Sequence, residues 1–389
     1  MTRDRAARPG GRAAKPPNRQ SRLWGGLGLA VLLAAACGGS RAVGTGADGA
    51  PRLPPARPDA VRDFDAALRA YKLGGPEAAE RAIERLHSAV KVDPRLWEGW
   101  YDLGVLYLGR GNFGEAIASL DRALAIRGNF RPALLARAEA HRQSGGTDAA
   151  RADYGRVLAL DPGDRIVGAR LAALLRERKK YEDALDVIRA ILRNAGADGQ
   201  IYVELGLIYL DQGRLDLAEL VLRKALEADA KLPAAHNAFA LLALERGQDQ
   251  VAFERFDQAT ALDPGYVDAR FNKAAVLLDA GDFARARADL SRVVELRPDD
   301  VDARVALGVA LRGLKDFERA RATWEDVVRQ APRHAPARGD ALFNLAVLEM
   351  DHLSDDKAAL RALDRYLQQA GRAHPKRKEA QERKKELGL

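Results

Sequence analysis

Small amino acids recur in this chain at a fixed interval of 34 residues. Seven successive units without insertions begin at residues 97, 131, 165, 199, 233, 267 and 301. The eighth position of each unit is Gly or Ala, and the twenty-fourth is always large. The twentieth position is always alanine: Ala116, Ala150, Ala184, Ala218, Ala252, Ala286 and Ala320. A period of this length predicts an architecture that repeats one supersecondary unit.

Each unit is predicted to form a hairpin of two antiparallel helices. Two helices approach closely only where both present Gly or Ala, and a bulky side chain beside the contact fills the groove. Glycines such as Gly111 and Gly213 separate the two halves of a unit, and prolines such as Pro162 and Pro264 end the second half. A single hairpin leaves apolar faces uncovered, so neighbouring hairpins are expected to stack into an all-α solenoid.

These positions resemble the tetratricopeptide repeat family. The family pattern is fullest in residues 97–130, as Trp100, Leu103, Gly104, Tyr107, Ala116, Leu120 and Ala123. The resemblance implies a right-handed superhelix of helical hairpins over residues 62–372, with seven regular repeats at 97–334 and an irregular unit on each side. Arg137 and Lys273 replace the leucine that the family prefers, so their helices are expected to pack more loosely. Residues 373–389 are mostly charged and are predicted to form a polar capping helix that begins near Pro375.

The first 61 residues have the composition of an export signal and a tether. A basic stretch precedes the uncharged residues 23–36, which are too few to span a bilayer as a helix. Residues 33–37, Leu-Ala-Ala-Ala-Cys, resemble the bacterial lipobox, which implies a signal peptide at 1–36 and a lipid on Cys37. By the same resemblance, Gly38 implies sorting to the outer membrane, facing the periplasm. Residues 37–61 are predicted to be a flexible linker. The alternative is a soluble secreted protein in which Cys37 is a free thiol.

The net charge of +8 is concentrated in this leader. Residues 1–22 contain seven basic residues and one acidic residue, which leaves 56 basic and 54 acidic residues downstream. The repeats are therefore close to neutral, and nucleic acid is not expected as a partner.

No arrangement of residues in the sequence points to catalysis, a metal or a cofactor. The six histidines, His87, His141, His236, His334, His352 and His374, are scattered and lack the spacing of metal ligands. No nucleophile elbow, phosphate-binding loop or dinucleotide fingerprint is present. The chain is therefore expected to be a binding protein, not an enzyme.

The family resemblance places the binding surface on a concave groove lined by the first helix of each repeat. The groove residues predicted in this way are Tyr101, Val105, Leu135, Glu139, Val203, Leu207, Asn237, Leu241, Phe271 and Asn272. Most are apolar, and the Lys and Asn set with which some family members hold a carboxyl terminus is missing. The groove is therefore expected to bind an apolar or amphipathic segment of a partner protein, and Asn237 and Asn272 to hydrogen-bond its backbone. The alternative is that these side chains only pack neighbouring helices together.

Two functions fit such a protein. The first is a scaffold for an envelope complex, because the chain resembles tetratricopeptide lipoproteins of myxobacterial gliding motility and the pilotins of type IV pilus secretins. The second is an adaptor that recruits or regulates a peptidoglycan hydrolase or synthase, or a protease.

Overall fold

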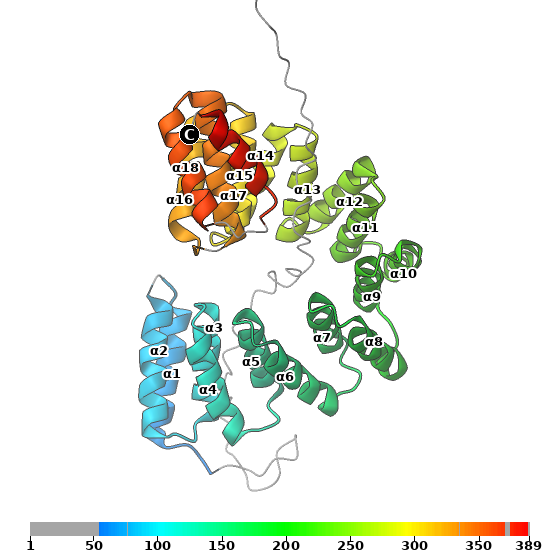
Figure 1. The fold of residues 1–389 in the computed structure, drawn as a ribbon. Coiled ribbons are helices and arrows are strands. Elements are labelled where there is room, and N and C mark those ends of the chain that lie inside the picture. Colours follow the sequence, from blue (N-terminus) through cyan, green and yellow to red (C-terminus); the bar gives the residue numbers. More distant parts are fainter. Residues whose placement is uncertain (1–53, 76, 334, 370–373, 388–389) are drawn as a thin grey trace, which may run out of the picture. The chain divides into compact units, whose positions relative to one another are not determined.

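The computed structural model describes residues 54–75, 77–333, 335–369 and 374–387, and within these it contains 19 α-helices and one π-helix. The described chain divides into two compact units, which we call the N-terminal unit (residues 54–214) and the C-terminal unit (residues 215–387). Figure 1 shows the helices of both units in chain order. Cys37 and the predicted signal peptide lie outside the described residues.

The N-terminal unit consists of nine helices among its described residues. They are α1 (Pro58–Lys72), α2 (Ala78–Val92), α3 (Trp97–Gly109), α4 (Phe113–Ile126), α5 (Arg131–Gln143), α6 (Thr147–Leu160), α7 (Arg165–Glu177), α8 (Tyr181–Ala195) and α9 (Gly199–Asp211). Successive helices pair as hairpins, and the hairpins stack on one another.

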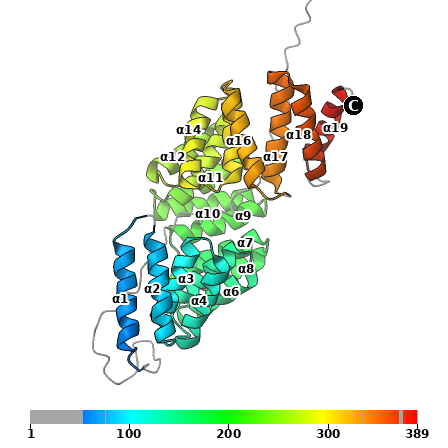
Figure 2. The ribbon, with the colours of Figure 1, turned by 90° about the vertical axis from the view of Figure 1, so that its left-hand side faces the viewer.

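The C-terminal unit continues the same pattern. Its helices are α10 (Leu215–Ala228), α11 (Pro233–Glu245), α12 (Asp249–Leu262), α13 (Val267–Asp279), α14 (Phe283–Leu296), α15 (Val301–Gly313), α16 (Phe317–Gln330), α17 (Pro336–Leu348), the π-helix η2 (Glu349–Leu353), α18 (Asp356–Gln369) and α19 (Arg377–Glu386). Figure 2 shows α17, α18 and α19 side by side at the carboxyl end of this unit.

The predicted period is confirmed by the helix boundaries. The seven first helices begin at residues 97, 131, 165, 199, 233, 267 and 301, and the seven second helices at 113, 147, 181, 215, 249, 283 and 317. All seven alanines of the twentieth position are fully buried. The predicted all-α hairpin solenoid is therefore the observed fold, while the handedness of its superhelix stays a prediction.

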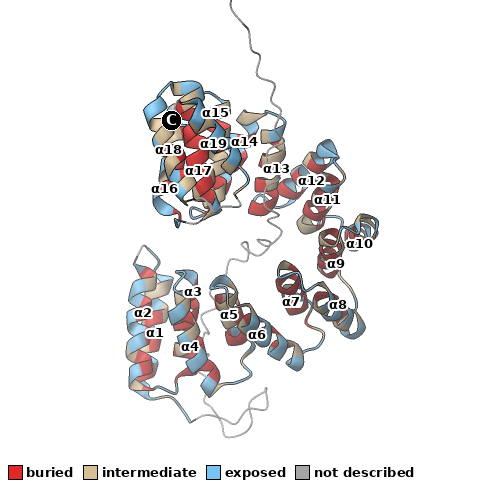
Figure 3. Ribbon diagram, in the orientation of Figure 1, coloured by how far each residue is buried: buried red, intermediate tan, exposed pale blue. Residues whose placement is uncertain are grey.

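In six of the seven regular hairpins the first helix has more buried residues than the second, because it contacts the second helix of its own hairpin and the neighbouring hairpins as well. Ten residues of α3 are buried, but only five of α4. Figure 3 shows the same difference between α17, which is largely buried, and α18, whose outer side is exposed. The second helices therefore supply most of the accessible surface of each hairpin.

Both ends of the repeat region differ in detail from expectation. Helix α1 begins at Pro58, so residues 58–61, assigned to the linker, are helical; proline is well suited to the first turn because it lacks an N–H to satisfy. Pro375 lies two residues before α19, which begins at Arg377, and not in its first turn. The irregular unit after the regular repeats is formed by α17 and α18 with η2 between them.

Candidate protein-binding surfaces

The predicted groove residues of the N-terminal unit are mostly inaccessible. Val203 and Leu207 on α9 are fully buried, and Tyr101 and Val105 on α3 are at most 7% exposed. Tyr101 also packs edge-on against Phe130, with 5.1 Å between the ring centroids. These side chains hold helices together, as the packing interpretation of the sequence predicted. A partner can reach them only if the helices separate.

Leu135 and Glu139 on α5 are half-buried and thus partly accessible. Glu139 is engaged by Arg142, one turn further along the helix, whose Nη2 and Nε donate to its carboxylate at 2.6 and 3.0 Å. Burial is the largest influence and opposes the ionisation of Glu139, but the hydrogen bonds and charge of Arg142, together with Gln143 and Arg170, outweigh it and lower the pKa of the carboxyl group. Glu139 is therefore charged and paired at neutral pH.

In the C-terminal unit the two predicted asparagines lie next to each other. Asn272 Nδ2 on α13 donates to Asn237 Oδ1 on α11 at 3.4 Å. Asn237 is 1% exposed, whereas Asn272 is half-buried. Leu241 is half-buried and Phe271 is buried. Asn272 and Leu241 are therefore the accessible members of the predicted groove in this unit.

A buried charged network connects α7 and α9, and sequence reasoning missed it. Arg176 on α7 is 2% exposed, and its Nη1 donates to Asp211 Oδ2 at 3.0 Å. Its Nε lies 3.8 Å from Oε2 of Glu204, which is fully buried. The twelfth position is arginine in three repeats (Arg142, Arg176 and Arg312) and leucine in the other four. An arginine at this position therefore does not by itself indicate a buried network.

Two carboxyl groups at this network, Glu204 and Glu177, have raised pKa values. Burial raises the pKa of Glu204 to about 7, against the opposing effect of Arg176. Burial also raises the pKa of Glu177, at the end of α7, to about 7. Desolvation penalises the charged form of a carboxyl group, and here the nearby arginine does not fully compensate. The network therefore changes its charge near neutral pH.

Open clefts lie on the other side of the hairpins, between successive second helices. Each is formed by a second helix, the first helix of the next hairpin, and the second helix of that hairpin. Three of these second-helix clefts lie in the C-terminal unit, at α10–α12, α14–α16 and α16–α18, with volumes of about 470, 600 and 540 Å³. Sequence reasoning, which considered only first-helix positions, did not predict them.

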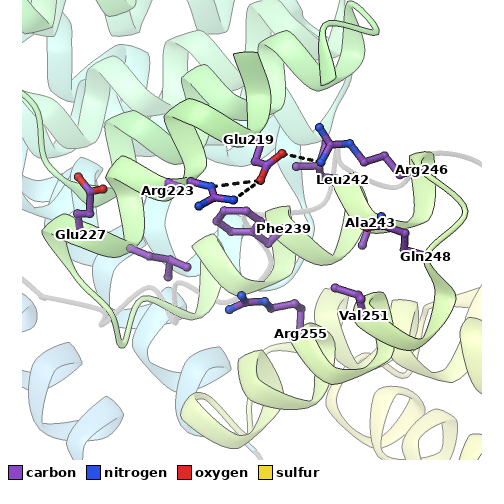
Figure 4. A pocket seen from close by; sticks show the side chains of 11 residues that line it. Glu219, Arg223, Glu227, Phe239, Leu242, Ala243, Arg246, Gln248, Val251 and Arg255 are labelled. Carbon is purple, nitrogen blue, oxygen red and sulfur yellow. Dashed lines mark hydrogen bonds and ion pairs between the residues drawn. The ribbon is translucent and has the colours of Figure 1, made fainter. Parts of the chain in front are cut away.

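The cleft at α10–α12 combines arginines with an apolar base (Figure 4). Arg223 Nε and Arg246 Nη1 donate to Glu219, at 3.1 and 2.6 Å. Arg255 lies over the ring of Phe239, 5.3 Å from its centroid. In the cleft at α14–α16, Arg319 pairs with Asp316. The arginines of the first cleft are thus occupied by neighbours within the unit.

Within the described residues, no group of three or more potential metal-ligating side chains is close enough to hold an ion. None of the helices in the described part of the chain is long and apolar enough to cross a membrane.

Comparison with known proteins gives consistent matches to one repeat family. Two family models, both described as tetratricopeptide repeat, match residues 64–130, 135–199, 170–233 and 237–301 in one case and 277–342 in the other. A curated relative, the cytochrome c-type biogenesis protein CycH of Rhizobium meliloti, is 30% identical over 119 residues. That match covers 30% of this chain and 31% of the relative, and a match to the human superkiller complex protein 3 covers 10% of that protein.

Solved structures share the fold at low sequence identity. A tetratricopeptide repeat protein from Parabacteroides merdae is 16% identical with a TM-score of 0.55, and the match covers 64% of this chain and 99% of that one. The human IFIT1 dimer with m7Gppp-AAAA is 17% identical with a TM-score of 0.55, and the match covers 86% of this chain and 82% of that one. Likeness at this level of identity concerns the arrangement of helices alone.

Proposed function

The chain belongs to the tetratricopeptide repeat family, and from that premise we propose that it is a lipid-anchored scaffold that assembles an envelope complex at the outer membrane. The family and its stacked hairpins establish a scaffold for protein–protein interaction. The observation that carries the proposal is the combination of this stack with the lipobox-like residues 33–37. The proposed assemblies are motility, pilus or secretion machinery.

The role in assembly is supported by one relative. The name of CycH assigns that protein to the biogenesis of c-type cytochromes, and it shares 30% identity with part of this chain. A stack of hairpins suits assembly because side chains from many repeats can contact one extended partner or several partners at once. Loss of the chain should then abolish a whole complex. If loss instead changed only peptidoglycan turnover or proteolysis, the adaptor function would replace this proposal.

The anchor is tested by the chemistry of Cys37. Cells expressing the full chain are grown with an alkyne analogue of palmitate, and the chain is then purified and probed for the label. The expected result is labelling and membrane fractionation of the native chain, with both lost in a Cys37→Ser variant. Labelling that survives in Cys37→Ser, or a native chain without label, would contradict the anchor.

The partner surface is tested by crosslinking in intact envelopes followed by purification of the chain. Leu207→Asp is unsuitable as a variant because it would place a carboxylate at a fully buried position and unfold the repeat. We choose Leu135→Gln with Leu241→Gln, one accessible groove residue from each unit. Leu160→Gln with Leu220→Gln is the matched control, since these leucines are 51% and 56% exposed on second helices.

The expected result is loss of specific partners from the Leu135→Gln, Leu241→Gln variant and their retention by the control variant. An unchanged partner set in the groove variant would remove the first-helix groove from the proposal, because both changes delete apolar contact area from that surface.

A further inference from the structure

The cleft between α16 and α18, which we call the arginine cleft, is lined by more arginines than either of the other second-helix clefts. It is lined by Arg329 of α16, Arg338 of α17, and Arg361 and Arg365 of α18. Its base is apolar: Leu342 and Leu345 are buried there, and Ala358 is half-buried. In the cleft at α10–α12 the arginines are already engaged by Glu219 and Phe239, as described above. The arginines of the arginine cleft have fewer such partners, as the following contacts show.

The acidic residues at the arginine cleft do not balance its arginines. Glu349 is 5% exposed and accepts two hydrogen bonds from Arg321, both at 2.8 Å, so its charge is already compensated. Arg329 Nη2 lies 3.2 Å from Asp326. Glu325 is the remaining acidic residue of the lining. Within the described residues, Arg361 and Arg365 have no hydrogen bond or ion pair. Both are exposed and lie one turn apart on α18.

Arg338 shows the electrostatic consequence of this crowding. Its Nε donates to Gln369 Oε1 at 2.8 Å and its Nη1 to the carbonyl oxygen of Ala331 at 2.7 Å, so neutral groups hold it in place. Burial lowers the pKa of its guanidinium, and the positive charges of Arg365 and Arg333 lower it further. Like charges are thus held together at this cleft, which favours an anionic ligand.

We propose that the arginine cleft binds an acidic segment of a partner protein, with carboxylates on Arg361 and Arg365 and apolar side chains against the half-buried Ala358. Arginine forms bidentate hydrogen bonds with carboxylates, and Ala358 together with the aliphatic stems of the arginines adds contact area that a small anion cannot use. A protein segment fits better than a nucleic acid, because the repeats as a whole are close to neutral.

This inference rests on the proposed function only in taking the partner to be a protein; it requires neither the lipid anchor nor the first-helix groove. A chain that is not labelled by palmitate but still binds an acidic peptide would contradict the lipid anchor and leave the arginine cleft supported.

The test uses the purified chain and a fluorescent synthetic peptide of alternating Glu and Leu pairs, followed by fluorescence polarisation. Peptides with Gln or Lys in place of Glu, and inorganic phosphate as a competitor, are the ligand controls. The variants are Arg361→Glu with Arg365→Glu, and the neutral pair Arg361→Gln with Arg365→Gln. Arg189→Glu with Arg193→Glu is the matched control, because these arginines are also exposed and one turn apart on a second helix, α8.

The native chain and the α8 variant are expected to bind the acidic peptide equally. The Arg361→Glu, Arg365→Glu variant should bind it at least about tenfold more weakly and should gain affinity for the Lys peptide, since complementarity of charge determines the preference. The neutral pair should weaken binding without that gain. Circular dichroism checks that each variant is folded.

Equal binding of the acidic peptide by the native chain and the α18 variants would overturn the proposal. Equal binding of the Gln peptide by the native chain would show that charge is irrelevant, and so would overturn it. If phosphate competed at the same concentration as unlabelled peptide, the cleft would be a site for small anions. That result would also overturn the proposal.

Discussion

Lysine occupies, at residues 179 and 315, the turn position that glycine occupies in the other five regular repeats. The five glycines, from Gly111 to Gly281, have φ between 71° and 86°, and Lys179 and Lys315 have φ of 58° and 62°. A side chain with a Cβ is disfavoured in this left-handed conformation by roughly 1 to 2 kcal/mol. The two lysines therefore place local strain at the turns of two otherwise regular hairpins.

Lys315→Gly is predicted to stabilise the C-terminal unit by roughly 0.5 to 1 kcal/mol, because relief of strain exceeds the added backbone entropy of the unfolded chain. Urea denaturation followed by circular dichroism measures the change. Lys315→Ala, which shortens the side chain and keeps the Cβ, should give no such gain. Equal stabilisation by Gly and Ala would show that the lysine side chain, not the backbone, is the source of the cost.

At Gly308 two helices are in close contact, and the neighbouring side chain is rigid and buried. A Cβ at this position would lie 2.3 Å from Nε1 of Trp324, which is fully buried and donates to the carbonyl oxygen of Val305 at 3.0 Å. The sequence predicted a helix contact here, because the eighth position of every regular repeat is Gly or Ala. It did not predict which partner would make alanine too large.

Gly308→Ala is therefore expected to destabilise the chain by roughly 1 to 3 kcal/mol, the usual cost of overpacking a core. Gly109→Ala is the control, because a Cβ there meets nothing within 4 Å. Thermal unfolding of both variants decides the point. A Gly308→Ala chain as stable as the native one would mean that the indole moves aside without cost.

At the scale of single elements, the predicted starts of the seven regular repeats coincide with the first residues of their first helices, but the period did not predict the geometry of the last unit. From α3 to α4 the interval between helix starts is 16 residues, whereas from α17 to α18 it is 20. The additional residues form η2 and the left-handed Ser354, at φ 56°. A hairpin can absorb such an insertion in several ways, and periodicity does not distinguish among them.

Ion pairs between elements were also missed. Arg137 and Lys273 were expected to loosen their helices, but Arg137 Nε donates to the buried Asp153 at 2.8 Å, and Lys273 Nζ lies 3.1 Å from Asp289. Both acids lie on the second helix of the same hairpin. The charged pairs thus replace the apolar contact that leucine makes elsewhere. A pattern of apolar positions cannot show this, because it treats each charge as a surface residue.

The network between α7 and α9 predicts a dependence of stability on pH. Glu204 has an ordinary pKa of 4.5 in the unfolded chain and about 7 in the folded chain. Between these values the folded state keeps a proton that the unfolded state has released, so stability falls as the pH rises through this range. The N-terminal unit should be about 2 kcal/mol less stable at pH 8 than at pH 5.5, from the shift of Glu204 alone.

Urea denaturation at the two pH values measures this difference. Glu204→Gln should lower the measured difference by about 2 kcal/mol, because the amide has no proton to release in this range, while Glu177 keeps its own contribution. Glu182→Gln, an exposed residue on α8, should leave it unchanged. A native chain that is more stable at pH 8 than at pH 5.5, with Glu204→Gln behaving identically, would show that Glu204 is ionised in the fold at both values.

For the whole molecule, the sequence predicted the stack of hairpins but not which faces would be open. Groove positions were counted along first helices, and Val203 and Leu207 proved fully buried, whereas the clefts lie between second helices. The repeat pattern predicts which residues are in contact within one hairpin. How far a neighbouring hairpin covers a face depends on the size of every side chain between them, and on substitutions such as Arg176 that no period encodes.

Because hairpins in such a stack contact mainly their neighbours, stability is distributed along the chain and is not shared equally by all helices. Gly104→Ala and Gly308→Ala make a matched pair for this property. The first places a Cβ 2.4 Å from Leu120 in the N-terminal unit, and the second clashes with Trp324 in the C-terminal unit. Each is predicted to accelerate hydrogen exchange in its own unit, most strongly in the mutated hairpin, and to leave the distant terminal hairpin unchanged.

Hydrogen exchange with mass spectrometry resolves the two units by peptide. Under Gly308→Ala, peptides of α15 to α18 should lose protection while those of α1 and α2 keep it, and Gly104→Ala should give the reverse. A single cooperative unit would instead lose protection everywhere by the same factor, whichever glycine is changed. That outcome would require coupling that reaches beyond neighbouring hairpins, and a partner bound at one cleft would then stabilise the whole chain instead of one part of it.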